Sequence, residues 1–401
     1  MSDQISNKNL YLFVLANYFI LFLSNELNSI NFSSNLGFSD QLEYLKIIIS
    51  APNLPEKVHY NQAQRFFFPY VIGYILEIIN YKTNFQNLFI FLNIFINLLI
   101  LQVTLLIFSH IKVKKNIQLV FISALIFNAY NFRISLFAPL MLNDYLFAYG
   151  LLLIVLFFLK KEKISFFYSG IIICSLTRQT SLTLNLLFLG IILYKVLKNK
   201  NYKINIFING IIINLLIFFI LKFVANEFSS SNFANLSKSI LGLFSFNYNF
   251  LELIVFIIHM LNANLFLFIL FFLLILNFNT LKIPVKLDFI IILSLGVLVW
   301  AQPILGGPSF TSSNISRLTV ISLPVFLVFF SIIFKNLELK FFNALFIVVL
   351  LFISSLHHNY TFFLSNFFEY DRYYYVCANF LMHFIIFIIL KKIDFKIDEI
   401  K

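Results

Sequence analysis

The residues best suited to chemistry lie in one polar stretch near the start of the chain, between apolar segments. Asp40 opens an amphipathic segment, and Tyr44, Arg65 and Pro69 follow it in the same stretch. A carboxylate in this position has two interpretations. It is either a general base that takes a proton from a hydroxyl group, or part of a helix N-cap, with Ser39 or Asp40 as the capping residue.

A second set of candidates consists of the arginines, at positions 65, 133, 178, 317 and 372, each at or near one end of an apolar run. The chain uses lysine for most of its cations, so the few arginines indicate a need for the planar guanidinium, which binds phosphate through two parallel hydrogen bonds. The alternative is that their charged groups extend to the lipid headgroups, which lysine would also do. We expect Arg178 and Arg317 to bind a phosphate, and Arg65 and Arg133 to organise the loops. Asp144, at the start of an apolar run, is either a second acid that orients substrate or the partner of Arg133.

The composition predicts that these residues sit in a membrane protein. Of the 401 residues, 61% are hydrophobic and 11% are charged, and the mean hydropathy is +0.92. Soluble domains contain roughly 25% charged residues, so most of this surface needs lipid as its solvent. We predict an all-α, polytopic bundle of about twelve spans forming one domain, 1–401, over these ranges: 10–24, 85–109, 117–130, 144–159, 164–177, 181–194, 204–224, 250–276, 288–301, 318–334, 341–356 and 376–390.

The lysines predict which ends of these spans face the cytoplasm. The first outer loop, 25–84, holds a further apolar stretch at 66–80, which we interpret as an interfacial helix rather than a thirteenth span. With a cytoplasmic N-terminus, 19 of the 29 basic residues then fall in cytoplasmic segments, and all 19 are lysines: positions 8, 112, 114, 115, 160, 161, 163, 195, 198, 200, 203, 282, 286, 335, 340, 391, 392, 396 and 401. The C-terminus is then cytoplasmic too. The net charge of +12 therefore fits membrane loops, and we expect no nucleic-acid partner.

Several motifs, in order along the chain, resemble the GT-C superfamily of membrane glycosyltransferases. They read Asp40-Gln-Leu-Glu-Tyr44, then Gln64-Arg65-Phe-Phe-Phe-Pro69, then NAYNFRISLFAPLMLNDY, and NISRL in a late outer loop. The segment CSLTRQTSL is similar to the RQT stretch of the dolichol-phosphate-glucose glucosyltransferases. The chain departs from the family because it has no acid adjacent to Asp40 and no His-Pro-Pro, which leaves the need for a divalent metal open.

The resemblance implies a multi-pass enzyme of the plasma (inner) membrane that acts on the non-cytoplasmic face. Such an enzyme transfers a sugar, with inversion, from a polyprenyl-phosphate donor to an envelope glycan, lipid or protein acceptor. Asp40 would be the general base, with no resident cofactor expected. The substrate-binding residues would be Tyr44, Arg65, Arg133, Asp144, Arg178 and Arg317.

Other polytopic proteins remain as alternatives. A transporter or lipid-linked-glycan flippase would place charges near the middle of the bilayer in paired halves, whereas here most charges lie at span ends and no repeat is evident. An O-antigen polymerase or ligase tends to have one large late loop, whereas the longest polar loop here is the first.

Overall fold

The protein is described from a computed structural model that covers residues 6–25, 39–80, 85–160, 163–198, 204–230, 250–278, 287–311, 314–356 and 372–392. Within these ranges the fold is all-helical, apart from an isolated bridge between Val58 and Ser229. The helices are α1 (Asn7–Leu23), α2 (Ser39–Ser50), α3 (Tyr60–Ala63), α4 (Phe67–Ile78), α5 (Phe85–Ile111), α6 (Lys115–Ile126), α7 (Phe132–Phe137), η2 (Pro139–Met141), α8 (Leu142–Lys160), α9 (Ile164–Thr177), η3 (Gln179–Ser181), α10 (Leu182–Leu197), α11 (Ile204–Phe228), α13 (Phe250–Leu276), α14 (Leu287–Thr311), α15 (Ile315–Val320), α16 (Leu323–Ile333), α17 (Phe341–Ser355) and α18 (Arg372–Lys391).

Each apolar range predicted from the sequence overlaps a helix, but 318–334 covers two helices, α15 and α16, and 117–130 extends past the end of α6 at Ile126. In the described part of the chain, six segments are long and apolar enough to cross a membrane, and shorter apolar helices of 10–17 residues accompany them. The six are Phe85–Ile111, Pro139–Lys160, Gln179–Leu197, Ile204–Phe228, Phe250–Leu276 and Leu287–Leu305. The architecture is therefore that of a helical, multi-pass membrane protein, and the figure of twelve spans stays a prediction.

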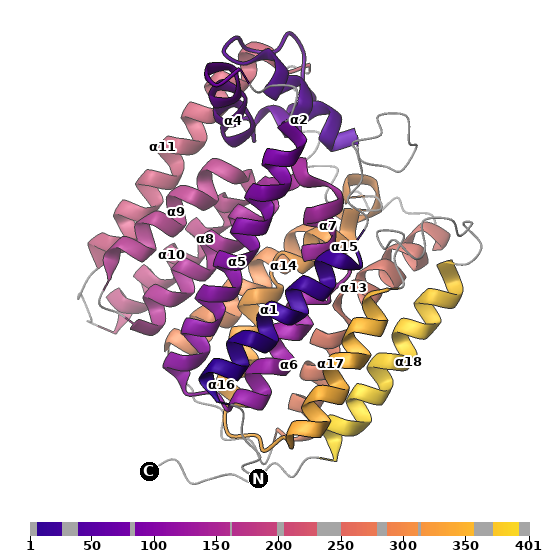
Figure 1. The fold of residues 1–401 in the computed structure, drawn as a ribbon. Coiled ribbons are helices and arrows are strands. Elements are labelled where there is room, and N and C mark those ends of the chain that lie inside the picture. The colour runs from indigo at the N-terminus through magenta and orange to yellow at the C-terminus, as the bar shows by residue number, and fades with distance from the viewer. Residues whose placement is uncertain are drawn as a thin grey trace.

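The two ends of the bundle carry different cations. At one end, the backbone N–H of Lys114 donates to the carbonyl of Lys335 (3.2 Å), and the Lys114 ammonium pairs with Glu338 (2.8 Å). His110 lies 3.3 Å from the carbonyl of Leu159, which brings a third lysine-rich connection to the same end. The segments α2, α4, α7 and α15, with the arginines considered below, lie toward the opposite end (Figure 1).

Two features of the packing hold the polar end in place. Helices α8 and α9 cross at Gly150 and Gly170, where a Cβ on either glycine would overlap the backbone of the other helix. Small residues allow such close approach between helices in a membrane, and this crossing brings the start of α8 beside the end of α9. The twelve-residue α4, about 18 Å long and thus short against a hydrocarbon core of about 30 Å, packs on α2.

Candidate active site

Asp40 lies at the centre of contacts between distant parts of the chain. One carboxylate oxygen, Oδ2, accepts a hydrogen bond from Arg317 Nη2 of α15 at 3.0 Å, and the other accepts one from Gln62 Nε2 of α3 at 2.6 Å. Asp40 lies in the first turn of α2, which the structure describes from Ser39 onward. The residues before Ser39 lie outside the described ranges, so the capping alternative for Ser39 or Asp40 stays a prediction.

Asp144, in the first turn of α8, contacts Arg317 and so joins one further arginine, Arg178, to this centre. Its Oδ1 pairs with Arg178, which lies between α9 and η3, and its Oδ2 lies 3.4 Å from Arg317 Nε. Since Arg317 contacts both carboxylates, Asp40, Arg317, Asp144 and Arg178 form one chain of ion pairs, here called the arginine–aspartate cluster. Of the two predictions for Asp144, the pairing with Arg133 is wrong.

Arg65 and Tyr44 border this cluster and attach the first loop to the bundle. The Arg65 Nε donates to Gln179 Oε1 at 3.4 Å, and the Arg65 carbonyl accepts a hydrogen bond from Asn143 Nδ2 at 3.0 Å. Tyr44 is buried on α2 and hydrogen-bonds the Arg65 side chain. Burial alone would lower the pKa of Arg65, but the adjacent Tyr44, Asp144 and Asp40 outweigh it and raise that pKa above its ordinary value.

Several polar atoms in and around the cluster lack a hydrogen-bond partner among the described residues. They include Arg317 Nε and Asp144 Oδ2, which are close enough for an ion pair but poorly aligned for a hydrogen bond, and also Asn143 Oδ1. Buried polar groups usually have a partner, so this region retains capacity for a polar ligand. Three arginines (65, 178 and 317) against two aspartates give a formal charge of +1, which favours an anion.

Arg133 lies apart from the cluster, in a separate buried site. Its side chain is fully buried and donates only to neutral oxygens: Ser355 Oγ (2.8 Å), Ser24 Oγ (3.0 Å), the Ser24 carbonyl (3.4 Å) and Asn25 Oδ1 (3.5 Å). No carboxylate of the described residues pairs with it, and burial lowers its pKa. The site ties α7 to the ends of α1 and α17, which agrees with the expected role as a loop organiser but not with contact to the same substrate.

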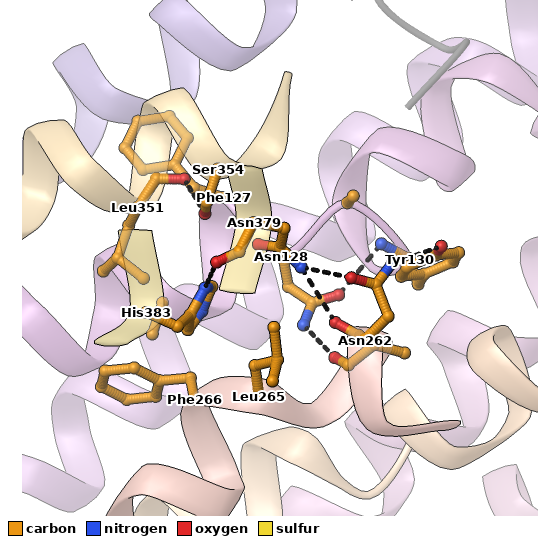
Figure 2. Close-up of a pocket in the computed structure, with 13 residues that line it drawn as sticks. Phe127, Asn128, Tyr130, Asn262, Leu265, Phe266, Leu351, Ser354, Asn379 and His383 are labelled. Carbon is orange, nitrogen blue, oxygen red and sulfur yellow. Dashed lines mark hydrogen bonds between the residues drawn. The ribbon is translucent and has the colours of Figure 1, made fainter. Parts of the chain in front are cut away.

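A third polar region, here called the asparagine cavity, lies between α6, α13, α17 and α18 (Figure 2). Asn262 Nδ2 donates to the Tyr130 hydroxyl at 3.1 Å, and Asn379 Nδ2 donates to Asn262 Oδ1 at 2.6 Å. His383 Nδ1 lies 2.9 Å from the Asn379 carbonyl. The cavity volume is about 20 Å³, which is enough for one or two water molecules.

The sequence interpretation missed Gln62, Gln179 and Met141, although each contacts a predicted site residue. The Met141 sulfur accepts from Arg317 Nη1 at 2.9 Å. No local pattern distinguishes these side chains, since each meets its partner only through tertiary contact. The Arg372 side chain lies outside the described residues.

The described residues contain no group of three or more His, Cys, Asp or Glu side chains that could hold a metal ion. The need for a divalent metal therefore stays open.

Comparison with known proteins does not assign the chain to a family. No protein-family model, no curated protein and no solved structure matches it.

Proposed function

We propose that this chain is a GT-C-type membrane glycosyltransferase with about twelve spans. In this proposal, it transfers a sugar from a polyprenyl-phosphate donor to an envelope glycan, lipid or protein acceptor. The reaction takes place at the non-cytoplasmic face of the plasma (inner) membrane, with both termini cytoplasmic. The observation that carries the proposal is the junction of a carboxylate, Asp40, with Arg317, which also contacts the Asp144–Arg178 pair.

The arginines would bind the donor phosphate. A guanidinium retains its charge in a poorly solvated site and donates two parallel hydrogen bonds to phosphate oxygens. Arg178 and Arg317 are buried and converge on Asp144 from opposite parts of the chain. The incompletely bonded Arg317 Nε is the donor that a phosphate oxygen would take first.

Asp40 would act on the acceptor. An acceptor hydroxyl attacks the anomeric carbon of the donor sugar from the face opposite the phosphate, and Asp40 receives its proton. The bond between the anomeric carbon and the phosphate oxygen breaks, and its electron pair leaves with the phosphate. The arginines stabilise the charge that develops on that oxygen, which is often the largest contribution to catalysis. Attack from the opposite face inverts the anomeric centre.

Binding of the phosphate would also release Asp40. In the ligand-free arrangement, Arg317 holds Oδ2 of Asp40 and Gln62 holds Oδ1. A phosphate that draws Arg317 toward itself frees one oxygen of Asp40 for the acceptor hydroxyl. The donor therefore binds before the acceptor in this scheme.

The experiment is mass analysis of polyprenyl-linked and envelope glycans in cells that lack the gene. These cells are complemented with the wild-type protein or with Asp40→Asn. We expect the wild-type protein to restore a glycan that the deletion removes. Asp40→Asn should be inserted in the membrane at a normal level but leave the sugar on its polyprenyl carrier, because the proton acceptor is lost.

Glu77→Gln is the matched control, since Glu77 is an exposed carboxylate on α4 of the same loop region. It should restore the glycan fully. Restoration by Asp40→Asn would contradict the base role. A deletion that changes the distribution of an intact lipid-linked glycan across the membrane, with no change in its sugars, would favour a flippase instead.

A further inference from the structure

A second small cavity lies beside the arginine–aspartate cluster, on its α11 side. Its lining includes Gln64, Gln179, Phe218 and Lys222, and its volume is about 10 Å³, enough for one water molecule. Gln64 is 94% buried, since its exposed fraction is 6%, and its side chain hydrogen-bonds Tyr60. A glutamine amide carries two N–H donors, so at a cavity wall it can also bond an acceptor atom from a ligand or water.

Lys222 places a cation at this cavity on the face of a lipid-exposed helix. Helix α11 is one of the six segments that can cross a membrane, and only 28% of its most apolar window is buried. The exposed neighbours of Lys222 on the helix are Phe219, Ile220 and Phe223. The Lys222 ammonium lies over the Phe218 ring at 5.5 Å, six residues, or about 9 Å, before the helix ends at Phe228. Intramembrane lysines are costly and often functional.

Gln179 connects this cavity to the cluster. The same side chain that lines the cavity accepts a hydrogen bond from Arg65 Nε through its Oε1. Arg65 in turn interacts with Asp40 and Asp144. A continuous series of polar side chains therefore runs from the lipid-facing surface of α11, through Gln64 and Gln179, to the arginines.

We propose that this series is the route by which a lipid-borne phosphate reaches the cluster sideways from the bilayer. Lys222 first binds the headgroup at the edge of α11, and Gln64 and Gln179 then pass it to Arg65. The inference rests on the proposed function, which it deepens by naming the entrance and by requiring a lipid-borne phosphate. The apolar residues around Lys222 favour a phosphate attached to a hydrocarbon chain over one from water.

The test is binding of undecaprenyl phosphate to the full-length protein in phosphatidylcholine nanodiscs, measured by native mass spectrometry. Lys222→Met should weaken binding about tenfold, as loss of one charge-assisted contact does, and Lys222→Arg should restore it. Lys195→Met is the matched control, because the Lys195 ammonium lies over Phe207 of the same helix at 4.7 Å but near the lysine-rich end. This control should bind as the wild type does.

Inorganic phosphate serves as the soluble probe. We expect it to compete weakly and to the same extent in the wild-type and Lys222→Met proteins, since the route from water does not pass Lys222. Unchanged binding of undecaprenyl phosphate by Lys222→Met, or an equal loss in Lys195→Met, would overturn the proposal. The same holds if Lys222→Met weakens both probes equally.

The outcome is separable from that of the proposed function. Lys222-dependent lipid binding without any Asp40-dependent sugar transfer would retain the entrance and reject the transferase. Asp40-dependent transfer with binding that ignores Lys222 would retain the transferase and reject the entrance.

Discussion

Arg133 and Arg317 are both buried at the same end of the bundle, but they have opposite kinds of partners. Arg133 donates to serine, asparagine and backbone oxygens at the ends of two helices, α1 and α17. Arg317 contacts two carboxylates and a methionine sulfur, and its Nε lacks a well-aligned hydrogen bond. One guanidinium is held by neutral groups, and the other by charged groups that an anion can replace.

The partners distinguish an arginine that holds the scaffold together, Arg133, from an arginine in a binding site, Arg317. A buried cation bonded only to neutral oxygens joins the ends of α1, α7 and α17, and its loss disconnects them. A cation in a chain of ion pairs can exchange one anion for another at little cost, because the incoming phosphate replaces the Coulomb energy of the carboxylate. Burial of an arginine is therefore not evidence of function, whereas its partners are.

The largest expected effect comes from Arg317→Lys. Lysine keeps the charge but loses the fork that contacts two groups at once, so we expect transfer to fall by at least about 100-fold, as with loss of one donor to a developing anion. The amount of folded protein and its thermal unfolding midpoint should change little. The measurement is the rate of sugar release from the polyprenyl carrier in purified membranes.

The matched comparison is Arg133→Lys assayed in the same membranes. Transfer per folded molecule should stay near the wild-type value, because this side chain touches no part of the cluster. Equal losses in the two variants would erase the distinction between them and leave general destabilisation as the explanation.

A smaller effect, on stability alone, is expected for Arg133→Met. The substitution leaves oxygens of Ser24, Asn25 and Ser355 without their donor, each at a cost of about 1–3 kcal/mol. Removal of a buried charge offsets part of this cost, so we expect a net loss of about 2–4 kcal/mol. The thermal unfolding midpoint in detergent measures it. A midpoint equal to that of the wild type would show that the neutral contacts contribute nothing.

The sequence predicted the elements better than the pairings. Apolar runs mark the helices because lipid requires every backbone group to be bonded within its own helix, and every predicted range overlaps a helix, although 318–334 is divided between α15 and α16. Two lysine-rich connections predicted to share one face, 112–115 and 335–340, do meet at one end of the bundle. Which side of the membrane this end faces stays a prediction.

The pairings could not be read from the sequence because they depend on tertiary contact. Asp40 and Arg317 are 277 positions apart, and Arg178 and Asp144 are 34 apart on different helices. Asp144 is closer in sequence to Arg133, which is 11 positions away, but the Gly150–Gly170 crossing brings the end of α9 to it instead. Gln62 and Gln179 gave no signal, since a glutamine in a polar loop is ordinary until its partner is known.

The most direct test of the account is the change in thermal unfolding midpoint that undecaprenyl phosphate causes in three proteins: the wild type, Arg317→Met and Arg133→Met. A ligand that binds only the folded state at 100 times its Kd stabilises it by about 2.7 kcal/mol. We predict that the ligand raises the unfolding midpoint of the wild type by the amount that corresponds to this free energy. Arg133→Met should show the same rise from a lower starting midpoint, and Arg317→Met should show none. An equal increase in Arg317→Met, or its loss in Arg133→Met alone, would contradict the assignment of the phosphate to the arginine–aspartate cluster.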